Sequence, residues 1–91
     1  MAIYRNTETG DLIDAWMHSK EEDLHTLAFP TWLYRLWEDG TAYTGAGDVD
    51  YLKTADGDVE IPDGHYITRG GGGALSVMTP ETIISQYLYE G

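Results

Sequence analysis

Turn signals follow one another closely in the last third of this chain and leave room only for short strands. Asp56-Gly57 stands between two alternating segments, residues 49–54 and 58–61, and is a strong signal for a two-residue hairpin loop. Pro62-Asp63-Gly64 predicts a second turn, because proline presets φ at the second turn position and glycine accepts a positive φ. Linked antiparallel hairpins are therefore expected here.

Two further strands and a helix complete this region. Residues 65–69 and 74–78 are expected to be strands, and the glycines at 70–73 turn the chain between them. Thr79-Pro80-Glu81 then supplies a helix N-cap, a proline at the first helical position and an acid that complements the helix dipole. The sequence predicts a C-terminal helix over residues 79–89, with an inner face of Ile83, Ile84, Tyr87 and Leu88.

The first half of the chain is less regular. Residues 3–5 and 12–17 are expected to be strands around a turn cluster at 6–11, which closes either a hairpin or a bulge within one long strand. Ser19 and Glu22 match a capping box and predict a short helix within residues 18–26.

A stronger helix signal lies at residues 31–38, ahead of a short strand at 41–44. Its start fits a Thr31 cap and its end fits Gly40, which accepts a positive φ. Four large apolar residues form one face of this helix: Trp32, Leu33, Leu36 and Trp37.

These elements predict an α+β fold in a single domain, residues 1–91. We expect a small, mostly antiparallel sheet of four to five strands, with one helix before the main hairpins and one at the C-terminus. A chain of 91 residues buries only a small core.

The charge balance excludes several function classes. Sixteen acidic residues face five basic ones, which gives a formal net charge of −11. Such a surface repels nucleic acids and anionic membranes, whereas it attracts basic protein surfaces. The acidity is either a solubility trait or a functional one, in which carboxylates present phosphate-like charge to a nucleic-acid-binding partner.

No chemistry-bearing motif stands out. The chain has no cysteine, and the spacing of His18, His25 and His65 matches no metal-binding pattern. The glycines at 70–73 precede a strand and lack a nearby lysine, so they predict a hairpin loop and not a phosphate cradle. We therefore expect no enzyme, no metal and no cofactor. The absence of cysteine, of an apolar span and of a signal-peptide pattern favours the cytoplasm.

The acids of the strands and turns are the candidate partner-binding residues. Alternation predicts that Asp50, Asp58 and Glu60 share one exposed sheet face. The full predicted set is Asp48, Asp50, Asp56, Asp58, Glu60 and Asp63.

Several short motifs between residues 30 and 90 are shared with one group of proteins. Pro30-Thr31-Trp32 corresponds to a Pro-x-Trp helix, residues 52–61 to an "ikTleGdmeV" hairpin and residues 63–70 to a "pGDyIikG" strand. On these motifs the chain resembles a family of small uncharacterised bacteriophage and prophage proteins, although His65 stands where the family carries an acid. The resemblance implies an α+β domain of phage origin and supplies no catalytic residues.

Together these observations predict a non-enzymatic acidic binding protein that inhibits a host defence system in the host cytoplasm. In its most concrete form it is anti-CRISPR-like and occludes a basic nucleic-acid channel of a host protein, without binding nucleic acid or membrane itself. Two alternatives stay open: a sponge for nucleotide signals, which would use Arg69, His65 and aromatic stacking, and a virion or assembly accessory protein. The oligomeric state is left open.

Overall fold

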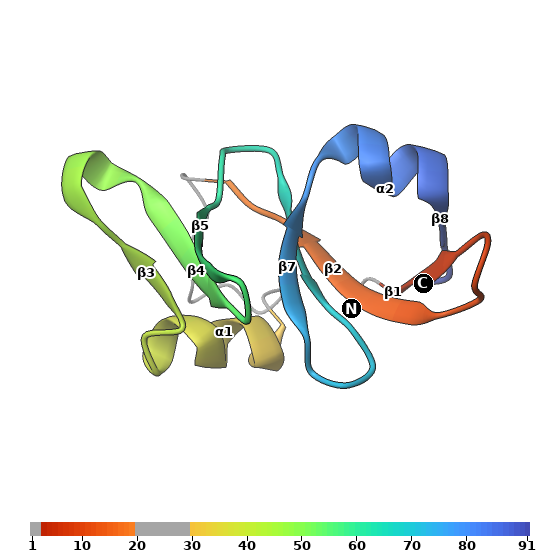
Figure 1. The fold of residues 1–91 in the computed structure, drawn as a ribbon, viewed down its shortest axis with the longest axis horizontal. Helices are drawn as coiled ribbons and strands as arrows, with labels where there is room; N and C mark the ends of the chain where they lie inside the picture. The colour runs from red at the N-terminus through yellow and green to blue at the C-terminus, as the bar shows by residue number, and fades with distance from the viewer. Residues whose placement is uncertain (1–2, 20–29) are drawn as a thin grey trace.

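The strands form two antiparallel sheets in a computed structural model that describes residues 3–19 and 30–91. The larger sheet has the strand order β7-β6-β2-β1-β8, and the smaller has the order β3-β4-β5 (Figure 1). Two helices accompany them, so the predicted α+β class is confirmed. The prediction of one sheet of four to five strands is corrected in one respect, because the strands divide between two sheets.

The larger sheet combines both ends of the chain. β1 (Ile3–Asn6) and β2 (Leu12–Met17) form a hairpin, so the turn at residues 6–11 is not a bulge. β6 (Tyr66–Arg69) and β7 (Leu75–Met78) form a second hairpin, which pairs with β2 through β6. β8 (Tyr87–Tyr89) adds to the free side of β1.

The smaller sheet contains the hairpin predicted around Asp56-Gly57. It consists of β3 (Ala42–Thr44), β4 (Asp50–Thr54) and β5 (Gly57–Glu60), with a short 3₁₀ helix at Ala46–Asp48 between β3 and β4. The predicted β4–β5 hairpin is confirmed. The predicted loop, Asp56-Gly57, is wrong by one residue: the loop residues are Ala55 and Asp56, because Thr54 pairs with Gly57, whose φ is 111°.

Helix α1 (Thr31–Glu38) has the predicted bounds. Its N-cap is Pro30, which offers no side-chain acceptor, so the predicted Thr31 cap is wrong. Gly40 has the expected positive φ, 84°, just after the helix. The predicted apolar face is confirmed, since Trp32 and Leu33 are buried and Leu36 and Trp37 pack against them.

Helix α2 (Pro80–Gln86) is shorter than predicted. It begins as expected, with Thr79 Oγ1 accepting a hydrogen bond from the backbone N–H of Thr82 at 3.2 Å. After Gln86 the chain forms β8. Pairing with the open edge of β1 satisfies backbone N–H and C=O groups that would stay exposed at the surface if the helix continued through the two tyrosines. The predicted inner helix face is therefore wrong for Ile84 and Leu88, which are 80% and 59% exposed.

The larger sheet separates two hydrophobic cores. On one face, buried Ile13 and Ala15 of β2 pack with Ile83 of α2. The other face carries Ile67 against α1 and the inner face of the smaller sheet, so α1 and α2 lie on opposite sides of the molecule (Figure 1). The buried residues of this second core are Trp32, Leu33, Ala42, Leu52, Ile61 and Ile67.

Backbone hydrogen bonds extend the β2–β6 pairing of the larger sheet to the turn at residues 62–64. His18, just after β2, donates its N–H to the carbonyl of His65 at 2.8 Å and accepts from the N–H of Gly64 at 2.8 Å. The predicted turn is confirmed, with a φ of 85° at Gly64. Pro62 takes the first turn position and not the predicted second one, because its carbonyl accepts from the N–H of His65 at 3.1 Å. The two hairpins that the turn links belong to different sheets.

One predicted element lies outside the described residues. The capping-box helix depends on Glu22, and His25 lies in the same segment, residues 20–29. Within residues 3–19 and 30–91, no helix has the length and apolar character that crossing a membrane requires.

Candidate partner-binding surface

The exposed side of the smaller sheet gathers aromatic and charged side chains. The register pairs Tyr43 with Tyr51, Tyr51 with Glu60, and Lys53 with Asp58, so these side chains share one face. The opposite side of the same strands carries Ala42, Leu52 and Val59 into the core. We call the first side the outer face and define it by Tyr43, Tyr51, Lys53, Asp58 and Glu60.

Direct contacts hold the outer face in order. The Tyr43 hydroxyl donates to Asp58 Oδ2 at 2.5 Å and therefore reaches across β4 from β3 to β5. The rings of Tyr43 and Tyr51 stack with centroids 5.5 Å apart and planes inclined by 23°. Lys53 Nζ lies 5.7 Å from the centre of the Tyr43 ring, within the range of a cation–π contact.

Gly45 leaves room for the Tyr51 ring beside the backbone. A Cβ on Gly45 would come within 2.8 Å of Tyr51 Cε2, closer than such atoms approach in proteins. The ring therefore lies directly against the backbone at the end of β3, and this fixes the aromatic pair beside the acids.

The hydrogen bond from Tyr43 has a measurable consequence. Donation to Asp58, with smaller contributions from burial and from the Asp58 charge, raises the pKa of Tyr43 above its usual value of about 10. A raised pKa means that the bond is intact below about pH 10 and is lost as the pH rises through the pKa of folded Tyr43. We expect a pH titration of the Tyr43 ring Cζ chemical shift to give a raised pKa that Asp58→Ala returns toward 10. An unchanged Tyr43 pKa in that variant would contradict the bond.

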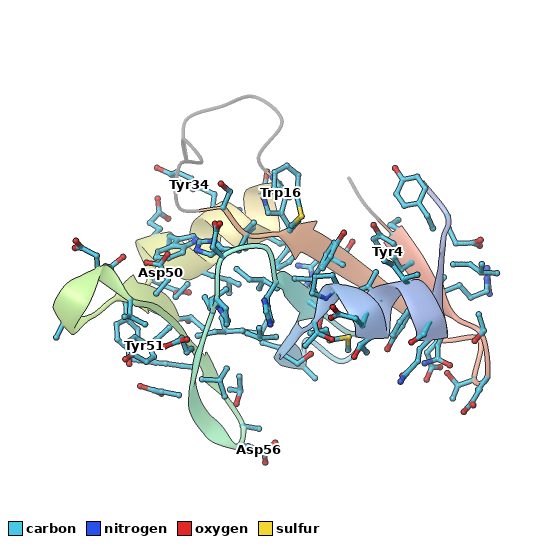
Figure 2. All side chains as sticks on the ribbon, turned by 90° about the horizontal axis from the view of Figure 1, so that it is seen from above. Tyr4, Trp16, Tyr34, Asp50, Tyr51 and Asp56 are labelled. Atoms are coloured by element: carbon cyan, nitrogen blue, oxygen red, sulfur yellow. The ribbon has the colours of Figure 1, made fainter. Side chains whose placement is uncertain are left out.

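Five of the six predicted acids are exposed, but only two of them lie on the outer face. Those two are Asp58 and Glu60. Asp56 sits at the free tip of the β4–β5 hairpin, away from the body of the molecule (Figure 2). Asp48 lies in the 3₁₀ helix, and Asp63 in the turn before β6.

The prediction for Asp50 is wrong. Asp50 is only 7% exposed and lies on the inner side of β4, because side chains alternate along a strand and Tyr51 takes the outer side. Its Oδ2 lies 2.6 Å from His18 Nε2, and its Oδ1 accepts from the Thr44 hydroxyl at 2.7 Å. Asp50 therefore belongs to the interior and not to an exposed acidic row.

This buried pair connects the two sheets. His18 follows β2 of the larger sheet, and Asp50 belongs to β4 of the smaller one. The imidazole of His18, itself 7% exposed, stacks on Trp37 of α1 with ring centres 6.0 Å apart. Neither the pairing of His18 with Asp50 nor the two tyrosines of the outer face is among the predicted site features. Alternation along residues 41–44 and 49–54 is a signal for the faces of Asp50 and the tyrosines, whereas no local signal points to His18.

Residues 3–19 and 30–91 contain no group of three histidines or carboxylates placed to hold a metal ion. The glycines at 70–73 form the predicted hairpin loop, with Gly73 N–H donating to the Gly70 carbonyl at 3.0 Å. Arg69 and His65 line different cavities, so no one of these cavities brings them together. The ligand-sponge alternative, with its site in a pocket or between subunits, stays a prediction.

Comparison of the chain with models of protein families, with curated proteins and with solved structures gave no match. The resemblance to the phage family stays a prediction from short motifs. The outer face and the charge of the chain are therefore the features that bear on function.

Proposed function

We propose that this protein is a non-enzymatic binding protein whose outer face occupies a basic, nucleic-acid-binding surface of a partner protein. The observation that carries the proposal is the placement of Asp58 and Glu60 beside the stacked Tyr43–Tyr51 pair. Acids and aromatic rings together on one exposed sheet face offer both charge and contact area.

The negative charge of the chain attracts a basic partner before contact is made. A net charge of −11 attracts a surface lined by lysine and arginine and speeds association with it. Asp58 and Glu60 lie two positions apart on β5, a spacing of roughly 7 Å. Both carboxylates can therefore contact neighbouring cations that lie in a row. A channel that neutralises phosphates is such a surface.

The tyrosines supply the contact itself. Tyrosine is enriched among the residues that dominate binding energy, because its ring buries a large area and its hydroxyl forms hydrogen bonds. Here the rings are already ordered by stacking, by Gly45 and by Asp58, so binding would cost little additional side-chain entropy.

The biological setting of the proposal comes from the phage-family resemblance. The resemblance implies that the partner is a nucleic-acid-binding complex of host defence. The chain would inhibit this complex in the host cytoplasm, in the manner of an anti-CRISPR protein. This part of the proposal rests on the sequence motifs at residues 30–90 and on the acidity of the chain.

A pull-down from nuclease-treated bacterial lysate tests the proposal. We expect the immobilised chain to retain a basic protein at low salt, and high salt or added nucleic acid to release it. Retention that neither salt nor nucleic acid affects would contradict occupation of a nucleic-acid channel. The retained protein then serves as the partner in the measurements described in the Discussion.

A further inference from the structure

Two of the few basic residues of this acidic chain line the same cavity. Arg35 of α1 and Arg69 of β6 border a cavity of about 490 Å³ between the helix and the β6–β7 hairpin. The cavity is open to solvent on one side, and its volume lies within the range of small-molecule sites. The cavity is lined by residues of α1, β6 and β7, whereas the outer face is built from β3, β4 and β5.

Arg69 is held in place by two neighbours. Its Nε and Nη2 donate to Asp14 Oδ2, directly opposite on β2, at 3.2 and 2.8 Å. Its guanidinium lies 5.0 Å from the ring centre of the buried Trp32. These contacts fix the plane of the guanidinium and leave Nη1 for another acceptor.

Arg35 differs from Arg69 because no carboxylate among the described residues forms an ion pair with it. Within residues 3–19 and 30–91, the ion pairs of arginine are Arg5 with Glu90 and Arg69 with Asp14. Arg35 is exposed on α1 and lines the cavity, and the lining contributed by residues 30–91 contains no acid. In a chain with a threefold excess of acids, an unpaired arginine beside a paired one leaves local positive charge.

The remaining walls suit a ligand that also has an apolar part. Leu36 and Leu75 line the cavity, and both are only partly buried. Thr31 contributes a hydroxyl at the start of α1, whose first turn contains no acidic side chain. The positive end of the helix dipole therefore adds to the arginines.

We infer that this cavity is a binding site for a small oxyanion attached to an apolar group, such as a phosphate monoester or an aromatic carboxylate. Arg35 binds the oxyanion together with the free edge of the Arg69 guanidinium, since arginine forms strong, charge-assisted hydrogen bonds to both chemistries. Leu36 and Leu75 contact the apolar group.

Chemical-shift titrations of the isotope-labelled protein test this site. The probes are phenyl phosphate, benzoate, inorganic phosphate and phenol. We expect saturable shifts at Arg35, Arg69 and Gly73 with phenyl phosphate, with benzoate or with both. The probe that binds more tightly identifies the oxyanion. Inorganic phosphate lacks the apolar group and phenol the charge, so both should bind several-fold more weakly.

Two variants separate the site from general charge effects. Arg35→Gln is expected to weaken binding about tenfold, the effect of one lost charge-assisted hydrogen bond. Lys53→Gln removes the same charge on the outer face and is expected to leave the affinity unchanged. The inference is overturned if neither anion gives saturable shifts at these residues in the millimolar range, if phenol binds as tightly, or if both variants weaken binding equally.

Discussion

Replacing Asp50 with alanine is expected to lower the free energy of unfolding by about 3 kcal/mol. The change leaves the buried His18 imidazole without its partner at 2.6 Å and the Thr44 hydroxyl without its acceptor at 2.7 Å. It also removes the side-chain link between the two sheets. Urea unfolding followed by circular dichroism measures the loss.

Asp56→Ala is the matched control for this substitution. Asp56 is an exposed aspartate at the hairpin tip, and its replacement should change the free energy of unfolding by less than about 0.5 kcal/mol. A double-mutant cycle with His18→Ala should give a coupling energy of at least about 1 kcal/mol between His18 and Asp50. Equal stability of the Asp50→Ala and Asp56→Ala variants would refute the structural role of the pair.

The second large effect concerns binding. Changing both Asp58 and Glu60 to lysine should weaken the complex with the partner retained in the pull-down by about 100-fold, because like charges then face each other across the interface. Loss of the Asp58 carboxylate also frees the Tyr43 hydroxyl. Surface plasmon resonance at low and high salt would measure the affinity and its salt dependence.

A variant with the same change in net charge tests whether position matters. Glu8 and Asp11 are exposed in the β1–β2 turn, away from the smaller sheet. Changing both to lysine should reduce the affinity by no more than a few-fold, through weaker long-range attraction. Similar losses in the two double variants would mean that net charge alone drives binding and that the outer face has no special role.

Local signals in the sequence account for much of the fold. The hairpin around Asp56, the Thr79 cap and helix 31–38 each depend on residues close together in the chain, and each was predicted. The division into two sheets depends instead on pairings between distant segments, such as β2 with β6 and β1 with β8. No turn signal specifies those pairings. The same reason explains residues 87–89, which are helical by pattern but take the open edge of β1.

The wrong prediction for Asp50 has a different cause from the missed strand pairings, because the inner position of Asp50 follows from local sequence signals. A two-residue loop at either 55–56 or 56–57 places Asp50 and Leu52 on the face of Val59 and Ile61, and not on that of Asp58 and Glu60. The predicted hairpin therefore already places Asp50 on the inner face of the sheet. A buried aspartate needs a partner, and neither His18 nor Thr44 could be assigned to it without the arrangement of the two sheets.

The most direct test of the proposed function is competition for the partner's nucleic-acid site. Labelled nucleic acid bound to the retained partner would be followed by fluorescence anisotropy while the chain is added. We predict that the wild-type chain displaces the nucleic acid completely, and that the Asp58→Lys, Glu60→Lys variant does not displace it at the same concentration. Stable binding of the chain while the nucleic acid stays on the partner would contradict the account.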